Sequence, residues 1–172
     1  MKLRKTIRRL FKGTYLLPSI VKNPHGGLKL VRRGKVRGRK IISKLYAPKD
    51  IGERFRRQEV IQNLDKFQGQ RYVLKVSRRY PSKKSVRIED WYDQPTLADV
   101  KKIHDGKVTK KLRLFCDSKG IPPHKLLELC SRAELELDNK QREIGVWFDN
   151  SPGNLSVDVE KSGKIIFRVF DF

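Results

Sequence analysis

The most regular pattern of apolar and polar positions lies at the C-terminal end of the chain. Apolar residues alternate there with other residues in three successive segments, which is typical of strands with one buried face. The alternating apolar positions are Ile144, Val146, Phe148, Leu155, Val157, Val159, Ile165, Phe167 and Val169. Two turn sequences, Ser151-Pro152-Gly153-Asn154 and Lys161-Ser162-Gly163, separate the segments. The pattern predicts a three-stranded antiparallel meander over residues 143–172.

Two earlier stretches carry apolar residues at the helical period instead. Residues 50–68 begin with Asp50 and Glu53 at capping-box spacing and continue with a stripe that predicts one helix. That stripe consists of Val60, Ile61, Leu64 and Phe67. Residues 96–138 repeat the helical period in three segments, the first opening with Thr96 and Asp99 as a second candidate capping box. This region is therefore predicted to be a helical unit.

Between these helical regions the alternation returns. Tyr72, Leu74 and Val76 share one parity within residues 71–79, which predicts a strand. A polar turn over residues 80–84 follows, and residues 85–88 have the composition of a partner strand. The prediction is a two-stranded β-ribbon over residues 71–88.

These elements together predict an α+β protein. A compact domain over residues 50–172 would hold the helix 50–68, the β-ribbon 71–88, the helical unit 96–138 and the β-meander 143–172. Before it, residues 1–49 are densely basic, are expected to form little core of their own, and predict a basic extended arm. The length of 172 residues is enough for one such domain and an arm.

Charge changes this picture, because it is distributed unevenly. Residues 1–50 hold 16 of the 41 Lys and Arg but only one of the 19 acids, so they carry +15 of the formal net charge of +22. A strongly basic protein with a pI near 10.3 suits an anionic partner, and nucleic acid is the commonest. No run of apolar residues approaches the roughly 18 needed to span a bilayer, so a membrane partner is not expected.

The densest basic stretch, Leu30–Lys44, contains no acid and is interrupted only by glycines and small or aliphatic residues. Such a segment is suited to lie along a phosphate backbone, where its cations release condensed counterions. Its candidate nucleic-acid-binding residues are Arg32, Arg33, Lys35, Arg37, Arg39, Lys40 and Lys44. The sequence therefore predicts phosphate-dominated nucleic-acid binding, in which affinity falls steeply as salt rises.

Two further groups of cations extend the candidate surface. The β-ribbon and its turn supply Arg78, Arg79, Lys83 and Lys84 as a second anchor. The helical segment that follows supplies Lys110 and Lys111. The helix predicted after Pro123 is a poor recognition helix, because its later acids, including Glu134 and Glu136, would be repelled by phosphates.

Catalytic chemistry is the less favoured function class. Asp117-Ser118-Lys119 and Asp138-Asn139-Lys140 match only the acid-x-Lys half of a metal-dependent nuclease site, and Asp149 and Asp158 could approach across a hairpin. The sequence shows no phosphate-cradling glycine loop and no nucleophile elbow. No catalytic residue, metal site or cofactor is therefore predicted, and a metal-dependent nuclease or integrase-like enzyme remains the alternative.

Cys116 and Cys130 lie in apolar stretches without the spacing of a zinc site, which predicts buried free thiols in a reducing compartment. The expected protein is intracellular, in the cytoplasm, nucleoid or nucleus, with an organellar location left open by the Arg-rich N-terminus. It would be a component of a larger ribonucleoprotein or DNA-processing assembly, with other protein subunits as further partners. A structural protein that docks its basic arm on an acidic protein partner is a third alternative.

Overall fold

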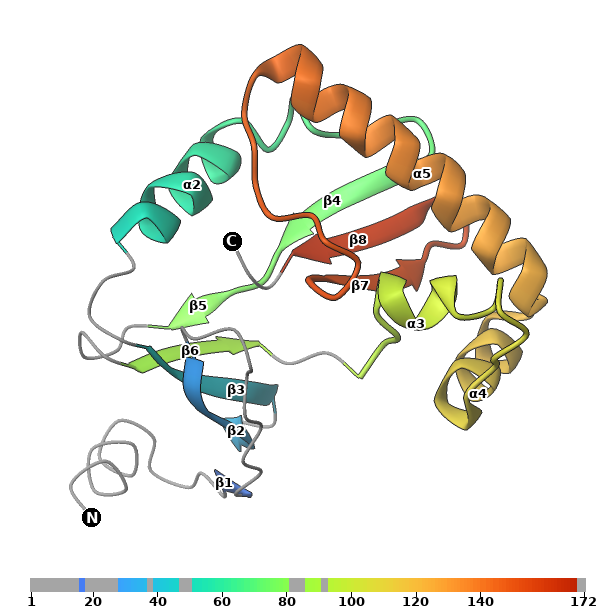
Figure 1. The fold of residues 1–172 in the computed structure, drawn as a ribbon, viewed down its shortest axis with the longest axis horizontal. Coiled ribbons are helices and arrows are strands. Elements are labelled where there is room, and N and C mark those ends of the chain that lie inside the picture. Colours follow the sequence, from blue (N-terminus) through green and yellow to red (C-terminus); the bar gives the residue numbers. More distant parts are fainter. Residues whose placement is uncertain are drawn as a thin grey trace. The chain divides into compact units, whose positions relative to one another are not determined.

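A computed structural model of the chain describes residues 16–17, 28–36, 39–46, 51–80, 86–90 and 93–169, with side chains over 55–78 and 93–169. The chain divides into two compact units, and its elements are shown in Figure 1. The first unit is Met1–Asp50 with Ser77–Tyr92, and the second is Ile51–Val76 with Asp93–Phe172. Residues 77–92 thus group with the N-terminal region, whereas the sequence predicted one continuous domain over 50–172.

The first unit contains a five-stranded sheet in which every pairing is antiparallel. Its strands are β1 (Leu16–Leu17), β2 (Leu28–Val36), β3 (Arg39–Tyr46), β5 (Arg79–Tyr80) and β6 (Val86–Asp90). Their order is β1-β2-β3-β6-β5, so β3 is central and pairs with both β2 and β6. The basic stretch Leu30–Lys44 therefore contributes two neighbouring strands that pair within the same chain.

The second unit combines a three-stranded sheet with four helices. The helices are α2 (Ile51–Gln62), α3 (Leu97–Lys101), α4 (Lys110–Lys119) and α5 (Pro123–Ile144), and the strands are β4 (Tyr72–Val76), β7 (Leu155–Val159) and β8 (Ile165–Val169). The strand order is β4-β8-β7, with β4 parallel and β7 antiparallel to the central β8. The prediction of a mixed helix-and-sheet protein is confirmed by this unit.

The core of the second unit lies between its sheet and α5, which runs across the sheet in Figure 1. The register aligns one face of the sheet with a set of positions that are all apolar. These positions are Tyr72, Leu74, Val76, Ile165, Phe167, Val169, Leu155, Val157 and Val159. From α5, a buried stripe at helical spacing packs into the same core, namely Leu126, Cys130, Ala133 and Leu137.

The C-terminal meander was predicted correctly for two strands and wrongly for the third. β7 and β8 form the expected antiparallel hairpin, but the third strand of the sheet is β4 rather than residues 144–148. Helix α5 continues to Ile144 and ends at Gly145, whose left-handed φ of 73° stops the helix. Val146 and Phe148 are buried beyond this cap without belonging to a strand, so their alternation reflects packing of a loop.

The predicted β-ribbon over 71–88 also needs correction. Its first strand is β4, which pairs in parallel with β8 because Tyr72 and Leu74 complete the apolar sheet face below α5. Only Arg79 and Tyr80 pair with β6, in the other unit. The helix predicted over 50–68 is regular through Gln62 and then continues as turns.

The helical unit predicted over 96–138 is confirmed as α3, α4 and α5, with the last helix longer than expected. Among the helices of the described residues, none combines the length and apolar composition that crossing a bilayer would require.

Candidate functional site

The loop between α5 and β7 carries several acid and amide side chains of the second unit. It begins at Gly145 and ends at Asn154, and it keeps Asp149 exposed between buried Phe148 and half-buried Asn150. The carboxylate oxygen Oδ1 of Asp149 accepts a hydrogen bond from the Ser151 backbone N–H at 3.0 Å. The Asn154 backbone N–H in turn donates to the Ser151 carbonyl at 2.8 Å.

Helix α5 holds this loop at two points on either side of Asp149. Gln141 is only 1% exposed, and its Oε1 accepts a hydrogen bond from the Phe148 backbone N–H at 3.1 Å. One turn earlier on the same helix, Asp138 accepts a hydrogen bond from Nδ2 of Asn150 at 2.6 Å. The peptide that carries Asp149 is thus bonded to α5 through both of its neighbours.

The start of α3 supports the other side of the same loop. The Ala98 backbone N–H donates to the Pro152 carbonyl at 2.9 Å, and the Val157 N–H donates to the Pro95 carbonyl at 2.8 Å. Together with the α5 contacts, these bonds connect the loop to two helices and to the first residues of β7. Such dense bonding is unusual for a surface loop and is a property expected of a site that must keep one geometry.

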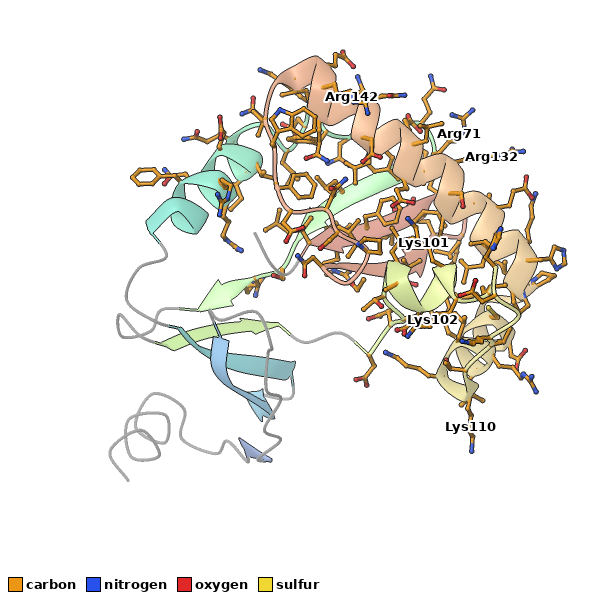
Figure 2. All side chains as sticks on the ribbon, viewed as in Figure 1. Arg71, Lys101, Lys102, Lys110, Arg132 and Arg142 are labelled. Atoms are coloured by element: carbon orange, nitrogen blue, oxygen red, sulfur yellow. The ribbon has the colours of Figure 1, made fainter. Side chains whose placement is uncertain are left out.

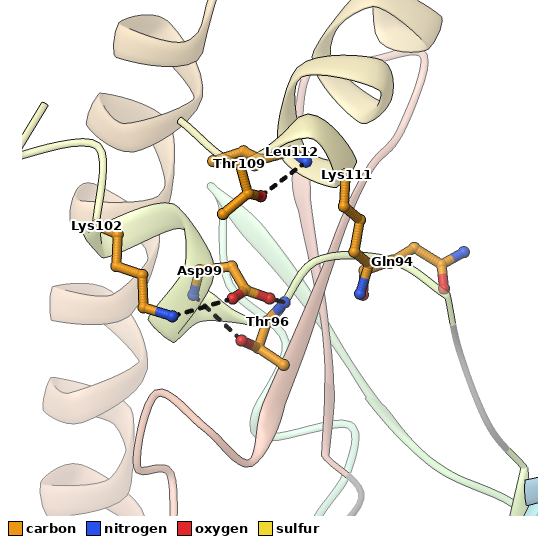
Figure 3. A network of polar contacts seen from close by, with 7 residues as sticks. All are labelled: Gln94, Thr96, Asp99, Lys102, Thr109, Lys111 and Leu112. Carbon is orange, nitrogen blue, oxygen red and sulfur yellow. Dashed lines mark hydrogen bonds and ion pairs between the residues drawn. The ribbon is translucent and has the colours of Figure 1, made fainter. Parts of the chain in front are cut away.

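Figure 3 shows the polar contacts that fix the starts of α3 and α4. Thr96 and Asp99 form the predicted capping box, with Thr96 Oγ1 accepting from the Asp99 N–H at 3.2 Å and Asp99 Oδ2 accepting from the Thr96 N–H at 3.1 Å. Burial opposes ionisation of Asp99, but the hydrogen bonds from Thr96 and the nearby charges of Lys102 and Lys111 hold its pKa below the ordinary value. Thr109 caps α4 by accepting from the Leu112 N–H.

Sequence reasoning considered Asp149 only as a metal-binding partner of Asp158, and the structure pairs Asp158 elsewhere. Asp158 Oδ1 lies 2.7 Å from Lys119 Nζ, an ion pair between the end of α4 and β7. Within the part of the chain that the structure describes, no group of three His, Cys, Asp or Glu could hold a metal ion. Asn154, five positions after Asp149 on the same loop, was not considered in the sequence analysis, although the spacing of the two residues is visible in the sequence.

The predicted nucleic-acid-binding residues lie mainly in the first unit. Arg32, Arg33 and Lys35 are on β2, Arg39, Lys40 and Lys44 are on β3, and Arg79 is on β5. Arg78 is exposed just before β5. Arg37, Lys83 and Lys84 fall outside the described residues.

The register of the first sheet gathers many of these positions on one face. Lys35 pairs with Lys40, and Lys44 pairs with Arg87. Directly paired positions share a face, as do alternate positions along each strand. One face therefore holds the positions of Arg33, Lys35, Lys40, Lys44, Arg79 and Arg87, with Glu89 as its acid. The opposite face holds the positions of Leu30, Val36, Ile41, Leu45, Val86 and Ile88, together with Arg32 and Arg39.

The two remaining candidates, Lys110 and Lys111, lie in the first turn of α4 in the second unit. Cations of this unit are spread over several elements rather than gathered, as the labelled side chains of Figure 2 show. Some are already engaged within the unit: Lys101 pairs with Glu134 at 2.7 Å, and Lys111 Nζ donates to the Gln94 carbonyl at 3.0 Å. This surface is less suited to a phosphate backbone than the sheet of the first unit.

The two cysteines are free and buried, as predicted. Burial raises the pKa of both thiols, with the nearby acids Asp117 for Cys116 and Glu134 for Cys130 adding to the effect. A buried thiol with a raised pKa is a poor nucleophile, so neither cysteine is a candidate for covalent chemistry.

No family model and no curated protein matches the chain. Among solved structures, a chain of the gentamicin–APH(2")-IIa complex is similar with a TM-score of 0.40 and 10% sequence identity, over 99% of this chain and 68% of that chain. A likeness at this level establishes neither a shared fold nor a shared function.

Proposed function

We propose that the second unit transfers a phosphoryl group from a nucleoside triphosphate to a hydroxyl, with Asp149 as the catalytic base. The observation that carries this proposal is the spacing of Asp149 and Asn154 on a firmly bonded loop. Protein kinases place the aspartate of their catalytic loop five positions before an asparagine, and a later Asp-Phe pair completes the set. Asp171-Phe172 follow β8 in this chain.

The order of elements supports the same assignment. The Asp149 loop follows the long helix α5 and leads directly into the β7–β8 hairpin. The register pairs Leu155 with Val169, so β8 ends beside the residue that follows Asn154. Asp171 is the second residue after Val169 in the sequence. Asn154 therefore lies at the end of the hairpin where β8 finishes, and Asp171 follows β8 in the sequence.

Two features depart from the kinase motif. Trp147 and Phe148 occupy the positions before Asp149 where kinases carry His and Arg. Phe148 is buried and packs edge-to-face on Phe67, with ring centroids 5.7 Å apart. An aromatic anchor thus fixes the start of the loop here.

The donor chemistry fits a magnesium ion. Mg²⁺ prefers hard oxygen ligands, which the Asn154 amide and the Asp171 carboxylate can supply. Within the described ranges, no hydrogen bond joins the Asn154 side chain to another residue. When bound, the ion would neutralise the charge that develops on the transferred phosphoryl group.

In the proposed reaction, a substrate hydroxyl oxygen forms a bond to the γ-phosphorus. The bond between that phosphorus and the bridging oxygen breaks, and the nucleoside diphosphate leaves. Asp149 accepts the proton of the hydroxyl, which is the role of a general base. Its exposure is compatible with an incoming substrate, and its bond to the Ser151 N–H orients the carboxylate.

The test measures release of inorganic phosphate and transfer of label from radiolabelled ATP with Mg²⁺. Asp149→Asn should lower the rate by about 10²–10⁴, the usual contribution of a general base. The matched control is Asp105→Asn, which removes an exposed acid from the turn after α3 and should leave the rate within about threefold. Equal rates for wild type and Asp149→Asn, or no Mg²⁺-dependent turnover at all, would overturn the proposal.

We also propose that the first unit binds nucleic acid through the cationic face of its sheet. The observation that favours this second function is the register, which pairs Lys35 with Lys40 and Lys44 with Arg87. Like charges directly opposite each other destabilise a sheet. An anionic partner on that face would reduce the repulsion between the paired cations. A phosphate backbone supplies a row of such charges and releases counterions when it binds.

Binding to labelled duplex DNA and single-stranded RNA, followed by fluorescence anisotropy, tests this second function. The double variant Lys35→Glu/Lys40→Glu should weaken binding and reduce the salt slope by about 2. The control, Lys66→Glu/Lys161→Glu, changes the net charge equally but at exposed positions of the second unit. A wild-type affinity that changes less than about threefold between about 50 and 200 mM salt would contradict phosphate-dominated binding.

A further inference from the structure

Gln141 occupies a place in α5 where the pattern of the helix calls for an apolar residue. It continues the buried stripe of Leu126, Cys130, Ala133 and Leu137 and is itself 1% exposed. Burying an amide without hydrogen bonds costs on the order of 1–3 kcal/mol. The bond from the Phe148 N–H to Gln141 Oε1 gives the amide oxygen a partner, and it pairs an N–H that lies in no strand.

Asp138 bonds the loop to α5 on the C-terminal side of Asp149, as Gln141 does on the N-terminal side. It lies three residues before Gln141 on the same helix, and its Oδ1 accepts from Asn150 Nδ2 at 2.6 Å. A hydrogen bond to an ionised carboxylate is roughly twice as strong as one between neutral groups. Asn150 directly follows Asp149, so this bond fixes the peptide on the C-terminal side of the exposed acid.

We propose that Gln141 and Asp138 are positioning residues that hold Asp149 in the geometry needed to accept a proton. This inference rests on the proposed phosphoryl transfer. Asp149 is exposed, and among the described residues its carboxylate accepts a hydrogen bond only from the Ser151 N–H, which lies in the same loop. The two bonds from α5 instead hold the backbone N–H of Phe148 and the side chain of Asn150. A displacement of about 1 Å at a reacting group can cost about a hundredfold in rate.

The activity test uses the full chain with Mg²⁺ and ATP. Asp138→Ala and Gln141→Met should each lower kcat by about 10- to 100-fold, with KM for ATP changed by less than about threefold, because the loop moves while the nucleotide contacts stay. Asp138→Asn keeps an oxygen that can accept from Asn150 and should restore kcat to within about threefold of wild type. Glu143→Ala, an exposed change on the same helix, is the control and should leave kcat unchanged.

A second measurement distinguishes failure of this inference from failure of the proposed function. Amide hydrogen exchange should show protection of the Phe148 N–H falling at least tenfold in Gln141→Met, and that of the Ser151 N–H falling in Asp138→Ala, while core amides of α5 stay protected. Wild-type turnover that is undiminished in both variants overturns the positioning role alone. Loss of activity without a change in loop exchange also overturns it. Absence of turnover in the wild type overturns phosphoryl transfer, and with it any catalytic role for the two residues.

Discussion

At the residue scale, Gly69 lies in the turn before β4, where the backbone closely approaches the side chains of Tyr72 and Glu136. A Cβ atom on Gly69 would lie 2.4 Å from Cε1 of Tyr72 and 2.9 Å from Oε1 of Glu136. Neither neighbour can move freely. Tyr72 is fully buried, and Glu136 accepts hydrogen bonds from the backbone N–H groups of Gln70 and Arg71 at 2.7 and 3.1 Å. The carboxylate thus secures the turn to α5.

Replacing Gly69 by alanine should therefore destabilise the fold. Overpacking of a close contact typically costs about 1–3 kcal/mol, and the free energy of unfolding in urea measures it. Gly153→Ala provides the comparison, because nothing lies within 4 Å of its added Cβ. A Gly69→Ala protein as stable as Gly153→Ala would show that the turn can shift away from Tyr72.

At the scale of elements, short α3 depends on its N-terminal cap. The helix has five residues, too few to be stable through its own backbone bonds. Its capping box combines the Thr96 hydroxyl with the Asp99 carboxylate, and the lowered pKa of Asp99 means that the folded state favours the ionised form. Because the folded-state pKa is depressed, the stabilisation is fully present above the unfolded pKa, near 3.8 for this group, and is lost as pH falls from there through the lower folded-state pKa.

The stability difference between wild type and Asp99→Asn should consequently depend on pH. At pH 7 the variant should unfold at lower urea concentration, by an amount near the usual cost of losing a cap, about 0.5–2 kcal/mol. The difference should shrink as the pH falls below the unfolded-state pKa and the folded wild-type carboxyl becomes protonated at its lowered pKa. Asp105→Asn serves as the control, and a constant difference for Asp99→Asn across the pH range would disprove the argument.

Elements with local signals were predictable from the sequence, and those with distant partners were not. The β7–β8 hairpin and the three helices of 96–138 follow from periodicity and turn residues that lie within each segment. The parallel pairing of β4 with β8 joins segments far apart in the chain. No local sequence pattern indicates that β4 pairs with β8. Phe148 alternates with its neighbours like a strand residue, but its N–H bonds to the Gln141 side chain.

The candidate site divides in the same way. The cations of β2 and β3 were recognisable from charge density alone, whereas their separation onto two faces required the register. The Asp149–Asn154 spacing was visible in the sequence, but the two hydrogen bonds from α5 to the loop were not. Hydrogen bonds between a helix side chain and an irregular backbone have no periodic signature.

At the scale of the whole molecule, the two units are interleaved along the chain. The first unit needs Ser77–Tyr92, which is inserted between β4 and the α3 region of the second. Removing residues 1–50 alone should leave β6 without its partner β3, and an unpaired strand edge promotes association between copies. Removing residues 1–50 and also replacing 77–92 by a Gly/Ser linker of equal length should give a monomeric second unit.

Size-exclusion chromatography and far-UV circular dichroism of the two truncated proteins check this prediction. The simple truncation should elute as larger species, and the linker version as a folded monomer with the helix content of α2 to α5. A simple truncation that is monomeric and folded would instead support the independent 50–172 domain expected from the sequence.

The cross-strand pairs of the first sheet also determine how the free protein responds to its solvent. Because Lys35 faces Lys40 and Lys44 faces Arg87 in the register, mobile anions that screen these pairs should raise the Tm of the first unit. The same ions compete with phosphodiesters for the same positions and weaken their attachment. As the salt concentration rises, the stability of the sheet should therefore increase while its affinity for nucleic acid decreases.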